Sequence, residues 1–351
     1  MILLNFDWAL LIEKLSLIAI IIFGSLGIAL YTTFAERKVA ALLQDRPGPN
    51  RAGPFGLLQP LADGVKMFTK EEIIPSSASK WLFILGPCIA MIAALMTCAV
   101  IPWGGTIELF DRTVSLQIAD INIGILYVFA VVSFGVYGIM IGGWASNNKF
   151  SLMAALRGAS QAISYELAMG LSLIAVLMIT GTLSIGEIVK QQQAGMWNIV
   201  YQPLGFLIFF ICALAECNRT PFDLPEAESE LNFGYHQEYS SMKLGFYLFA
   251  EYINMIMSSA VMVSMYFGGY DIPFVDDAAL QQTWGNWVAL LQVGVLLMKI
   301  VAFIFLFMWI RWTIPRFRYD QLMNLGWKKM IPLALANMII TGGVILYFLK
   351  K

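Results

Sequence analysis

The sequence predicts an all-α integral membrane protein in which about eight transmembrane helices form a single polytopic domain over residues 1–351. Its residues are 59% hydrophobic and only 13% charged, and its mean hydropathy is +0.73. Soluble domains carry about twice that share of charge. A helix needs about 20 mostly apolar residues to cross the hydrocarbon layer. Such stretches lie at 9–33, 81–101, 121–143, 160–182, 200–217, 244–267, 288–310 and 330–349.

The positive charges predict how these helices are oriented. The connections after the first, third, fifth and seventh spans hold 16 of the 22 lysines and arginines, and the opposite loops hold only Arg112 and Lys190. Because positively charged loops remain in the cytoplasm, we expect these four connections there and the N-terminus outside. The N-terminal stretch has no basic n-region or small-residue cleavage site, so we expect a retained first span.

The first connection, at about 36–79, predicts an amphipathic helix at the membrane interface. Its Gly- and Pro-rich stretch at 47–56 excludes a regular helix. Apolar residues then recur at helical spacing, namely Leu57, Leu58, Leu61, Val65 and Phe68. An inert surface helix would show the same pattern, but the rigid loop and the flanking charges favour the mouth of a cavity.

The densest group of charges lies between the fifth and sixth spans. Six carboxylates, Glu216, Asp223, Glu226, Glu228, Glu230 and Glu238, crowd around Arg219, His236 and Lys243. Like charges so close to a low-dielectric bilayer should raise some carboxyl pKa values toward neutrality. A solvated acidic loop is the simpler alternative, and His236 is expected to be solvated. Pro221 and Pro225, with apolar residues between them, favour a buried, folded loop instead.

Ionisable residues also fall inside the predicted spans, where they are costly and indicate functional sites. Glu166 and Glu251 are such residues, although a structural pairing with another helix is the alternative. Lys299 lies near the middle of its span and is expected to pair with Glu166 or Glu251, or to line a hydrated path. The arginines at 311–318 either hold the acidic loop by bidentate pairing or anchor lipid headgroups.

The chain lacks the motifs of a redox or nucleotide-binding protein. It has no GxGxxG loop, no Walker motif and no cysteine spacing suited to zinc or an iron–sulfur cluster. We interpret its four cysteines, Cys88, Cys98, Cys212 and Cys217, as core residues. One histidine excludes a multi-histidine site, and a net charge of −1 gives no basic surface for nucleic acid. Ion translocation, a binding cavity, or both remain, with redox cofactors supplied by partners.

Several longer motifs carry a family resemblance. They are Glu36-Arg37-Lys38 with 44–51, GLLQPLADGVK at 56–66, GWASNNK at 143–149, SYE at 164–166, PFDLPEAESEL at 221–231 and IPRFRYDQL at 314–322. Over essentially its whole length the sequence resembles the H subunit of bacterial proton-pumping NADH:quinone oxidoreductase (respiratory complex I), whose mitochondrial counterpart is NADH dehydrogenase subunit 1. It departs from the family pattern at Asn232, Phe233, Gln237 and Trp312.

The resemblance implies a subunit that joins the redox arm to the membrane arm and forms most of a chamber for ubiquinone or menaquinone. The residues implied to line or brace this chamber are Glu36, Arg37, Arg46, Asp63, Phe222, Asp223, Glu226, Glu228 and Arg316. Those implied to begin a proton path are Glu166, Glu216 and Glu251. Arg219, Arg318 and Lys299 are expected to form supporting ion pairs.

The resemblance also implies that this chain binds no cofactor itself, that quinone is the substrate, and that FMN and Fe–S clusters belong to partner subunits. The implied partners are iron–sulfur and quinone-site subunits of the peripheral arm and small and antiporter-like subunits of the membrane arm, surrounded by lipid in the bacterial inner (plasma) membrane. Quinone reduction should shift the ionisation of the acidic loop, and buried carboxylates should pass that change on. The alternatives are the related membrane component of energy-converting hydrogenases, less similar at the Gly/Pro loop, and a stand-alone ion transporter, whose internal repeat this chain lacks.

Overall fold

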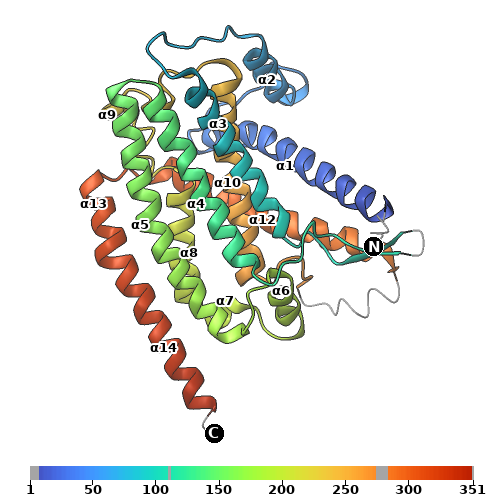
Figure 1. Cartoon of the computed structure of the whole chain (residues 1–351). Helices are drawn as coiled ribbons and strands as arrows, with labels where there is room; N and C mark the ends of the chain where they lie inside the picture. The colour runs from blue at the N-terminus through green and yellow to red at the C-terminus, as the bar shows by residue number, and fades with distance from the viewer. Residues whose placement is uncertain (1–7, 110–111, 274–283, 350–351) are drawn as a thin grey trace, which may run out of the picture.

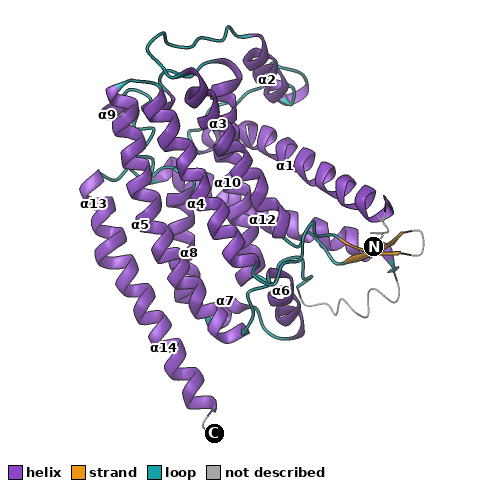
Figure 2. Cartoon of the chain, in the orientation of Figure 1, coloured by secondary structure: helices purple, strands orange, loops and turns teal. Residues whose placement is uncertain are grey.

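The computed structural model describes residues 8–109, 112–273 and 284–349, and helices dominate this part of the chain (Figure 1; Figure 2). Seven helical runs among the described residues are long and apolar enough to cross a membrane. They are α1 (Trp8–Leu43), α3 (Lys80–Met96) continued by η2 (Thr97–Val100), α4 (Gly124–Ala145), α5 (Lys149–Thr180), α10 (Ser241–Tyr266), α12 (Asn286–Thr313), and α13 (Tyr319–Asn324) with η4 (Leu325–Met330) and α14 (Ile331–Leu349). The shorter apolar helix α8 (Pro203–Glu216) occupies the place of the fifth predicted span. The expectation of an all-α membrane protein with about eight spans is confirmed.

The helices form a bundle from which two members slope away (Figure 1). Helices α3, α4, α5, α8 and α14 run along one another, whereas α1 and α12 are inclined to them. Helix α10 contacts both groups, since it packs on α3 and α8 and also on α1 and α12. Its apolar window is 67% buried, more than that of any other candidate span in the described chain. An ionisable residue on α10 is therefore surrounded by protein rather than lipid.

Small residues let the central helices approach closely and so position buried tyrosines. A Cβ at Gly138 of α4 would lie 2.7 Å from the Ala90 nitrogen of α3, and one at Gly142 would lie 1.9 Å from the Tyr247 hydroxyl. Tyr247 and Tyr239 use this space to donate hydrogen bonds to the Gly138 and Gly142 carbonyl oxygens at 3.0 and 3.2 Å. Close approach through small residues is typical of membrane bundles. Here it fixes the start of α10 against α4.

The charged connections gather at one end of the bundle (Figure 1). That end carries η1 (Pro54–Gly56), α2 (Gln59–Thr69), α9 (Glu228–Leu231) and η3 (Gly234–His236). Away from it lie the antiparallel hairpin of β1 (Thr106–Leu109) and β2 (Arg112–Ser115), with α6 (Ile185–Ala194) and α7 (Asn198–Tyr201). The segregation matches the distribution of lysine and arginine along the chain. Which end faces the cytoplasm, and hence the outside position of the N-terminus, stays a prediction.

The first connection contains the predicted amphipathic helix. After a non-helical stretch, α2 runs over Gln59–Thr69 and leaves Leu61, Val65 and Phe68 exposed. The preceding turn depends on Gly56, which has φ +84°, and a Cβ there would lie 2.1 Å from the Pro49 carbonyl oxygen. The exposed apolar side chains form the face that a membrane interface would cover.

Several boundaries differ from the predicted ones. Helix α1 continues through Leu43, so Glu36 and Arg37 lie on a helix rather than in a loop. Helix α5 begins at Lys149, after Asn148 caps it by accepting a hydrogen bond from the Phe150 nitrogen at 2.9 Å. These extensions contain charged residues, and hydropathy detects only the uninterrupted apolar part of a long helix. The hairpin and α6 were not predicted, for they carry neither long apolar runs nor dense charge.

Candidate functional site

The loop over 217–240 between α8 and α10 folds into the protein, as its prolines predicted. Gln161 of α5 donates from Nε2 to the carbonyl oxygens of Ala215 at 2.8 Å and Phe222 at 2.7 Å, which ties the loop to the bundle. The buried Phe222 ring packs against Tyr165 and Phe317, with centroids 5.3 and 5.5 Å apart. Phe222 therefore braces the loop from behind and lines neither of the cavities described below.

The loop forms one wall of a cavity of about 340 Å³, the polar cavity. Its lining residues are Thr220, Asp223, Glu226, Glu228, Phe233, Arg311, Trp312 and Arg316. The Arg316 guanidinium donates to the Asp223 carboxylate at 2.9 Å, so an arginine of the last connection holds the acidic loop. Glu228 is exposed at the rim. Four of the predicted quinone-chamber residues thus come together here, from two connections about 90 residues apart.

A second cavity of about 250 Å³, the α1–α2 cavity, lies between α1, α2 and α10. Its polar lining includes Glu36, Arg37, Asp63 and Tyr252, and Trp312 lines it as well as the polar cavity. Its apolar lining comprises Leu30, Pro60, Met67, Leu248 and Phe249. Arg37 pairs with Asp63 at 2.8 Å. Three predicted chamber residues of the first connection, Glu36, Arg37 and Asp63, therefore line this second cavity.

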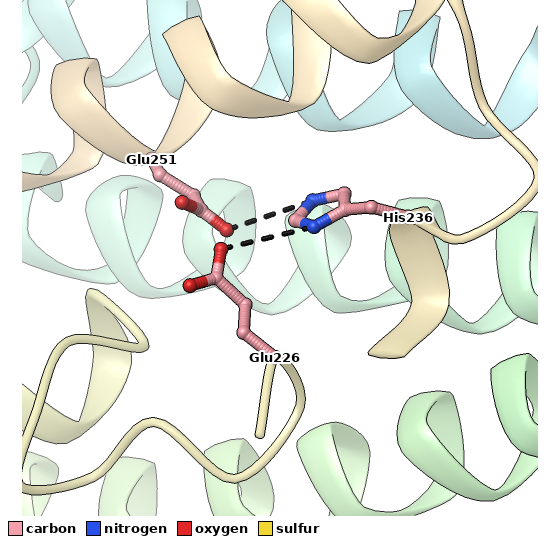
Figure 3. A group of neighbouring side chains, drawn as sticks. All are labelled: Glu226, His236 and Glu251. Atoms are coloured by element: carbon pink, nitrogen blue, oxygen red, sulfur yellow. Dashed lines mark ion pairs between the residues drawn. The ribbon is translucent and has the colours of Figure 1, made fainter. Parts of the chain in front are cut away.

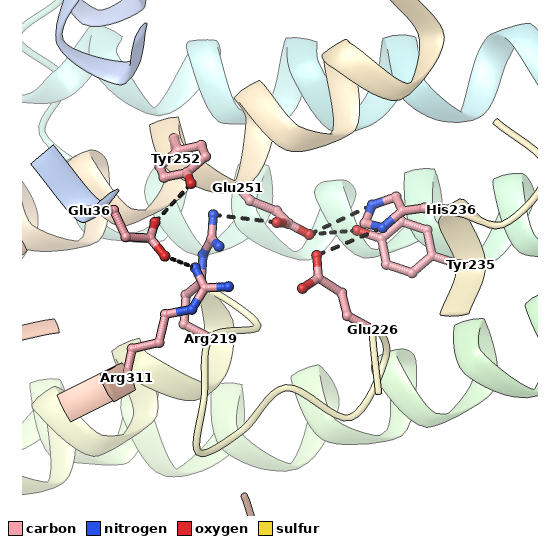
Figure 4. Close-up of polar contacts among 8 residues, drawn as sticks. All are labelled: Glu36, Arg219, Glu226, Tyr235, His236, Glu251, Tyr252 and Arg311. Carbon is pink, nitrogen blue, oxygen red and sulfur yellow. Dashed lines mark hydrogen bonds and ion pairs between the residues drawn. The ribbon is translucent and has the colours of Figure 1, made fainter. Parts of the chain in front are cut away.

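An ion pair joins the two cavities. Glu36 of α1 pairs with Arg311 of α12, and its second oxygen accepts a hydrogen bond from the Tyr252 hydroxyl at 2.8 Å (Figure 4). Glu36 lines the α1–α2 cavity, whereas Arg311 lines the polar cavity. Glu36 is only 7% exposed, so this pair fixes the position of α1 against α10 and α12.

Glu226, which lines the polar cavity, also belongs to a cluster of ionisable side chains (Figure 3; Figure 4). His236 Nδ1 is 3.7 Å from Glu226 Oε1, and His236 Nε2 is 3.8 Å from Glu251 Oε1. Glu251 also accepts a hydrogen bond from the Tyr235 hydroxyl at 2.9 Å and lies 3.5 Å from Arg219 Nη2. His236 is 1% exposed, so the expectation of a solvated histidine is wrong. Aromatic rings of Tyr235 and Tyr247 enclose it, which the charge pattern of the loop could not reveal.

Burial shifts the pKa of two groups in this loop. It raises the pKa of Asp223 to about 7, together with repulsion from Glu226 and against the attraction of Arg316. It lowers the pKa of His236 to about 4, although Glu226 favours the charged imidazolium. At neutral pH the polar cavity therefore has a carboxyl group that can bind or release a proton, and an uncharged imidazole lies beneath it.

The three predicted proton-path residues lie on neighbouring helices. Glu251 and Glu216 both line a small cavity of about 30 Å³, together with Tyr235, Asn218 and Asn254. Glu166 of α5 accepts a hydrogen bond from Ser133 of α4, and α5 packs on α8, which ends at Glu216. One oxygen of Glu216 has no hydrogen-bond partner among the described residues.

Three predicted residues lie away from this site. Arg46 is exposed, and its Nε donates to Gln44 at 2.8 Å. Arg318 is exposed, and no ion pair links it to another described residue. Lys299 donates to the carbonyl oxygens of Phe267, Gly269 and Asp271 just beyond the end of α10. That position is about 24 Å along the helix from Glu251, so pairing with Glu251 is excluded.

Comparison with known proteins places this arrangement in a family. A family model described as NADH dehydrogenase matches residues 15–342. The first of the NADH-quinone oxidoreductase H subunits of Cytophaga hutchinsonii is 69% identical over 96% of this chain and 98% of its own length. The H subunits of Flavobacterium johnsoniae and Geobacter metallireducens are 60% and 49% identical, over 96% and 95% of this chain and 96% of each relative. The chain belongs to the family of NADH-quinone oxidoreductase H subunits. It is thus a multi-pass membrane subunit of an oxidoreductase complex, and other subunits of that complex are its partners.

Sequence reasoning missed several side chains of this H-subunit site. Tyr252 and Tyr235 hold carboxylates in place, yet neither stood out in the sequence. Arg311 was expected to hold the acidic loop or lipid headgroups, and its partner Glu36 on α1 was not foreseen. Tyr252 directly follows Glu251 on α10, and adjacent helical residues point in directions about 100° apart. Only the close packing of α10 against both α1 and α8 lets both neighbours face ionisable partners.

Proposed function

We propose that this H subunit forms the chamber in which the complex reduces quinone, either ubiquinone or menaquinone. The observation that carries the proposal is that Trp312 lines two cavities, one polar and the other lined largely by apolar side chains. A quinone combines a polar ring with an apolar isoprenoid tail. The ring would occupy the polar cavity beside Asp223 and Arg316, and the tail would follow the α1–α2 cavity.

The exposed apolar face of α2 supports an entrance from the bilayer. Leu61, Val65 and Phe68 lie on the same helix as Pro60, Asp63 and Met67, which line the α1–α2 cavity. A helix with this apolar face rests at the level of the lipid headgroups. A lipid-soluble substrate could therefore pass beneath α2 without crossing water.

The chamber residues suit the chemistry of quinone reduction. A reduced quinone must take up protons, and Asp223, with a pKa of about 7, can supply one at neutral pH. Arg316 can hydrogen-bond a quinone oxygen and stabilise the negative charge that develops on it. We propose that FMN and iron–sulfur clusters in partner subunits supply the electrons.

We further propose that the acidic cluster starts a proton path into the membrane arm. Glu226 lines the polar cavity and lies beside Glu251, with His236 facing both carboxylates. Glu251 and Glu216 share a small cavity, and α8 packs on the helix that carries Glu166. Loss of a proton from Asp223 to quinone would change the charge next to Glu226. Low-dielectric surroundings then carry this change efficiently to the next carboxylate. The positive charge of Arg219 offsets part of the negative charge on Glu251.

Labelling with a photoreactive quinone analogue tests the chamber directly. In the assembled complex we expect labelled peptides to include Phe233 or Trp312, and an excess of natural quinone to suppress the labelling. A quinone-suppressible label confined to other subunits would overturn the proposed chamber.

Neutralising one carboxylate of the cluster tests the proton path. Glu251→Gln should abolish proton translocation in membrane vesicles, measured with a pH-sensitive dye during NADH oxidation. Glu230→Gln is the matched control, because Glu230 lies in the same loop but is exposed. Pumping at the parental rate in an assembled Glu251→Gln complex would exclude this route.

Partners and membrane can be established by co-purification. We propose that the chain resides in the bacterial inner membrane with peripheral-arm iron–sulfur subunits and antiporter-like membrane subunits. Mass spectrometry of proteins that co-purify with the tagged chain in mild detergent should identify these subunits. A nickel–iron hydrogenase in their place would assign the chain to an energy-converting hydrogenase instead.

A further inference from the structure

Glu226, His236 and Glu251 form a compact group of metal-ligand type (Figure 3). Each side chain offers one ligand atom, and these atoms all lie within 4.8 Å of one another. The two His236–carboxylate separations of 3.7 and 3.8 Å are too long for hydrogen bonds. A single ion binds only one of the two ring nitrogens, and the separation of that nitrogen from its nearer carboxylate approaches the spacing of neighbouring ligands around zinc, because bonds of about 2.0–2.2 Å in a tetrahedron place ligand atoms roughly 3.4 Å apart.

The histidine in this group is buried without a hydrogen-bond partner. His236 is 1% exposed, and neither of its ring nitrogens has a partner among the described residues. Glu251 is 5% exposed, and its Oε2 also lacks a hydrogen bond within the described chain. A buried polar atom without a partner destabilises the folded protein. Figure 3 shows the imidazole directed at the carboxylate pair, so a bound cation would satisfy one ring nitrogen together with an oxygen of each carboxylate.

We propose that Glu226, His236 and Glu251 form a binding site for a divalent transition-metal ion of the zinc class. An uncharged imidazole and two carboxylates are suitable zinc ligands, whereas magnesium and calcium prefer oxygen alone. Three protein ligands leave the fourth position open to water, which is the arrangement of an exchangeable site rather than a closed structural one.

The surroundings of the site set its affinity. The Tyr235 hydroxyl donates to Glu251 Oε1 at 2.9 Å and so orients that carboxylate, as outer partners of metal ligands do. Arg219, whose guanidinium lies 4.4 Å from the Tyr252 ring centroid and 3.5 Å from Glu251, repels a cation. A reversible, regulatory ion is therefore expected rather than a permanent one.

The ion can reach the site from the polar cavity. Glu226 lines that cavity, where Asp223 and Glu228 attract cations and Arg311 and Arg316 oppose them. A bound ion would occupy Glu226 and Glu251 together. If the proposed proton path is correct, it would block proton transfer between them and inhibit the enzyme reversibly.

The number of metal ions bound per complex can be measured without an assay of enzyme turnover. The assembled complex is dialysed against buffered Zn²⁺, and bound zinc is measured per complex for the parent and for His236→Gln. We expect His236→Gln to bind one ion fewer than the parent and Glu230→Gln, an exposed carboxylate of the same loop, to bind as many. Tyr235→Phe should weaken binding about tenfold.

A second substitution separates ligation from a structural effect of His236. His236→Cys restores a zinc ligand, so it should recover the ion and give a thiolate-to-metal absorption band with Co²⁺ as the probe. Equal zinc binding by the parent and His236→Gln would overturn the proposal, as would failure of His236→Cys to recover the ion in a complex of normal subunit content. Failure of the proton path would leave these counts unchanged.

Discussion

Lys299 and the Glu226–His236–Glu251 cluster are both charged groups taken out of water, but their surroundings differ. The Lys299 ammonium donates to three carbonyl oxygens at 2.8, 2.9 and 2.8 Å and lies 4.6 Å from the Trp197 ring centroid. In the cluster, both His236 nitrogens and one Glu251 oxygen have no hydrogen bond among the described residues.

The difference separates a structural charge from a reactive one. An ammonium has three donors, and three backbone carbonyls match them, so Lys299 fastens α12 to the end of α10. Buried polar atoms are nearly always paired in folded proteins, and unpaired ones call for a functional explanation. The cluster retains capacity to bind protons or a cation, whereas the Lys299 site has its donors satisfied by fixed backbone oxygens.

The largest expected effect is on stability at Lys299. Lys299→Met leaves three carbonyl oxygens without their charged donor, and we expect a loss of about 3 kcal/mol in the free energy of unfolding. Thermal unfolding of the assembled complex measures it, with exposed Lys190→Met as the control. Unchanged stability with lost proton pumping would mean that Lys299 belongs with the functional charges.

Substitution of Glu216 should lower activity without lowering stability, the opposite of the effect expected at Lys299. Among the described residues no cation pairs with it, so Glu216→Gln should leave thermal stability unchanged or raise it. Quinone reduction coupled to pumping should fall at least about tenfold, or about 1.4 kcal/mol in activation free energy. The exposed Glu187→Gln is the control. A variant that loses stability and activity together would show that Glu216 is a structural charge.

The sequence predicted the elements better than their contacts. Apolar stretches predicted the spans, and the helical spacing of apolar residues predicted α2. The prolines and crowded acids of the loop predicted that it is buried and that a carboxyl pKa is raised, as the pKa of Asp223 is. These features depend on residues close together in the chain. The Glu36–Arg311 pair joins residues 275 positions apart, and no spacing rule identifies such a pair.

Two expectations show where sequence reasoning stopped, for physical reasons. Lys299 is central in α12, and pairing with Glu166 or Glu251 was one expectation for it, but it donates to carbonyl oxygens beyond the end of α10, where Glu251 is out of reach. His236 was expected in water because its loop is rich in charge. Tyrosine rings and α10 shield His236 from water, and the charge pattern of the loop contains no information about that packing.

The pH dependence of stability sharpens the comparison further. The pKa of Asp223 is raised from 3.8 to about 7 on folding, so the folded state holds a proton that the unfolded state has released. Its contribution to stability is therefore complete below pH 3.8 and is lost as the pH rises to about 7. Asp223→Asn should remove this decline.

The test is the difference in melting temperature between parent and Asp223→Asn at several pH values. His236, with a pKa lowered from 6.5 to about 4, contributes the opposite slope, but it is present in both proteins and cancels in the difference. Parallel profiles would show that Asp223 stays ionised in the folded complex.

Trp312 provides the smallest expected effect and tests whether the two cavities act as one site. Its ring lines both, so Trp312→Ala removes an aromatic wall whose packing is worth about 1 kcal/mol. We expect KM for a long-tailed quinone to rise roughly two- to tenfold with little change in kcat, since binding rather than proton supply is altered. Trp309→Ala, an exposed tryptophan on the same helix, is the control. If KM rises equally in both variants, Trp312 acts through the membrane surface of α12, and quinone does not occupy the two cavities as one site. If KM rises only in Trp312→Ala, the quinone ring and tail occupy one continuous chamber, whose polar end adjoins the cluster with unpaired polar atoms.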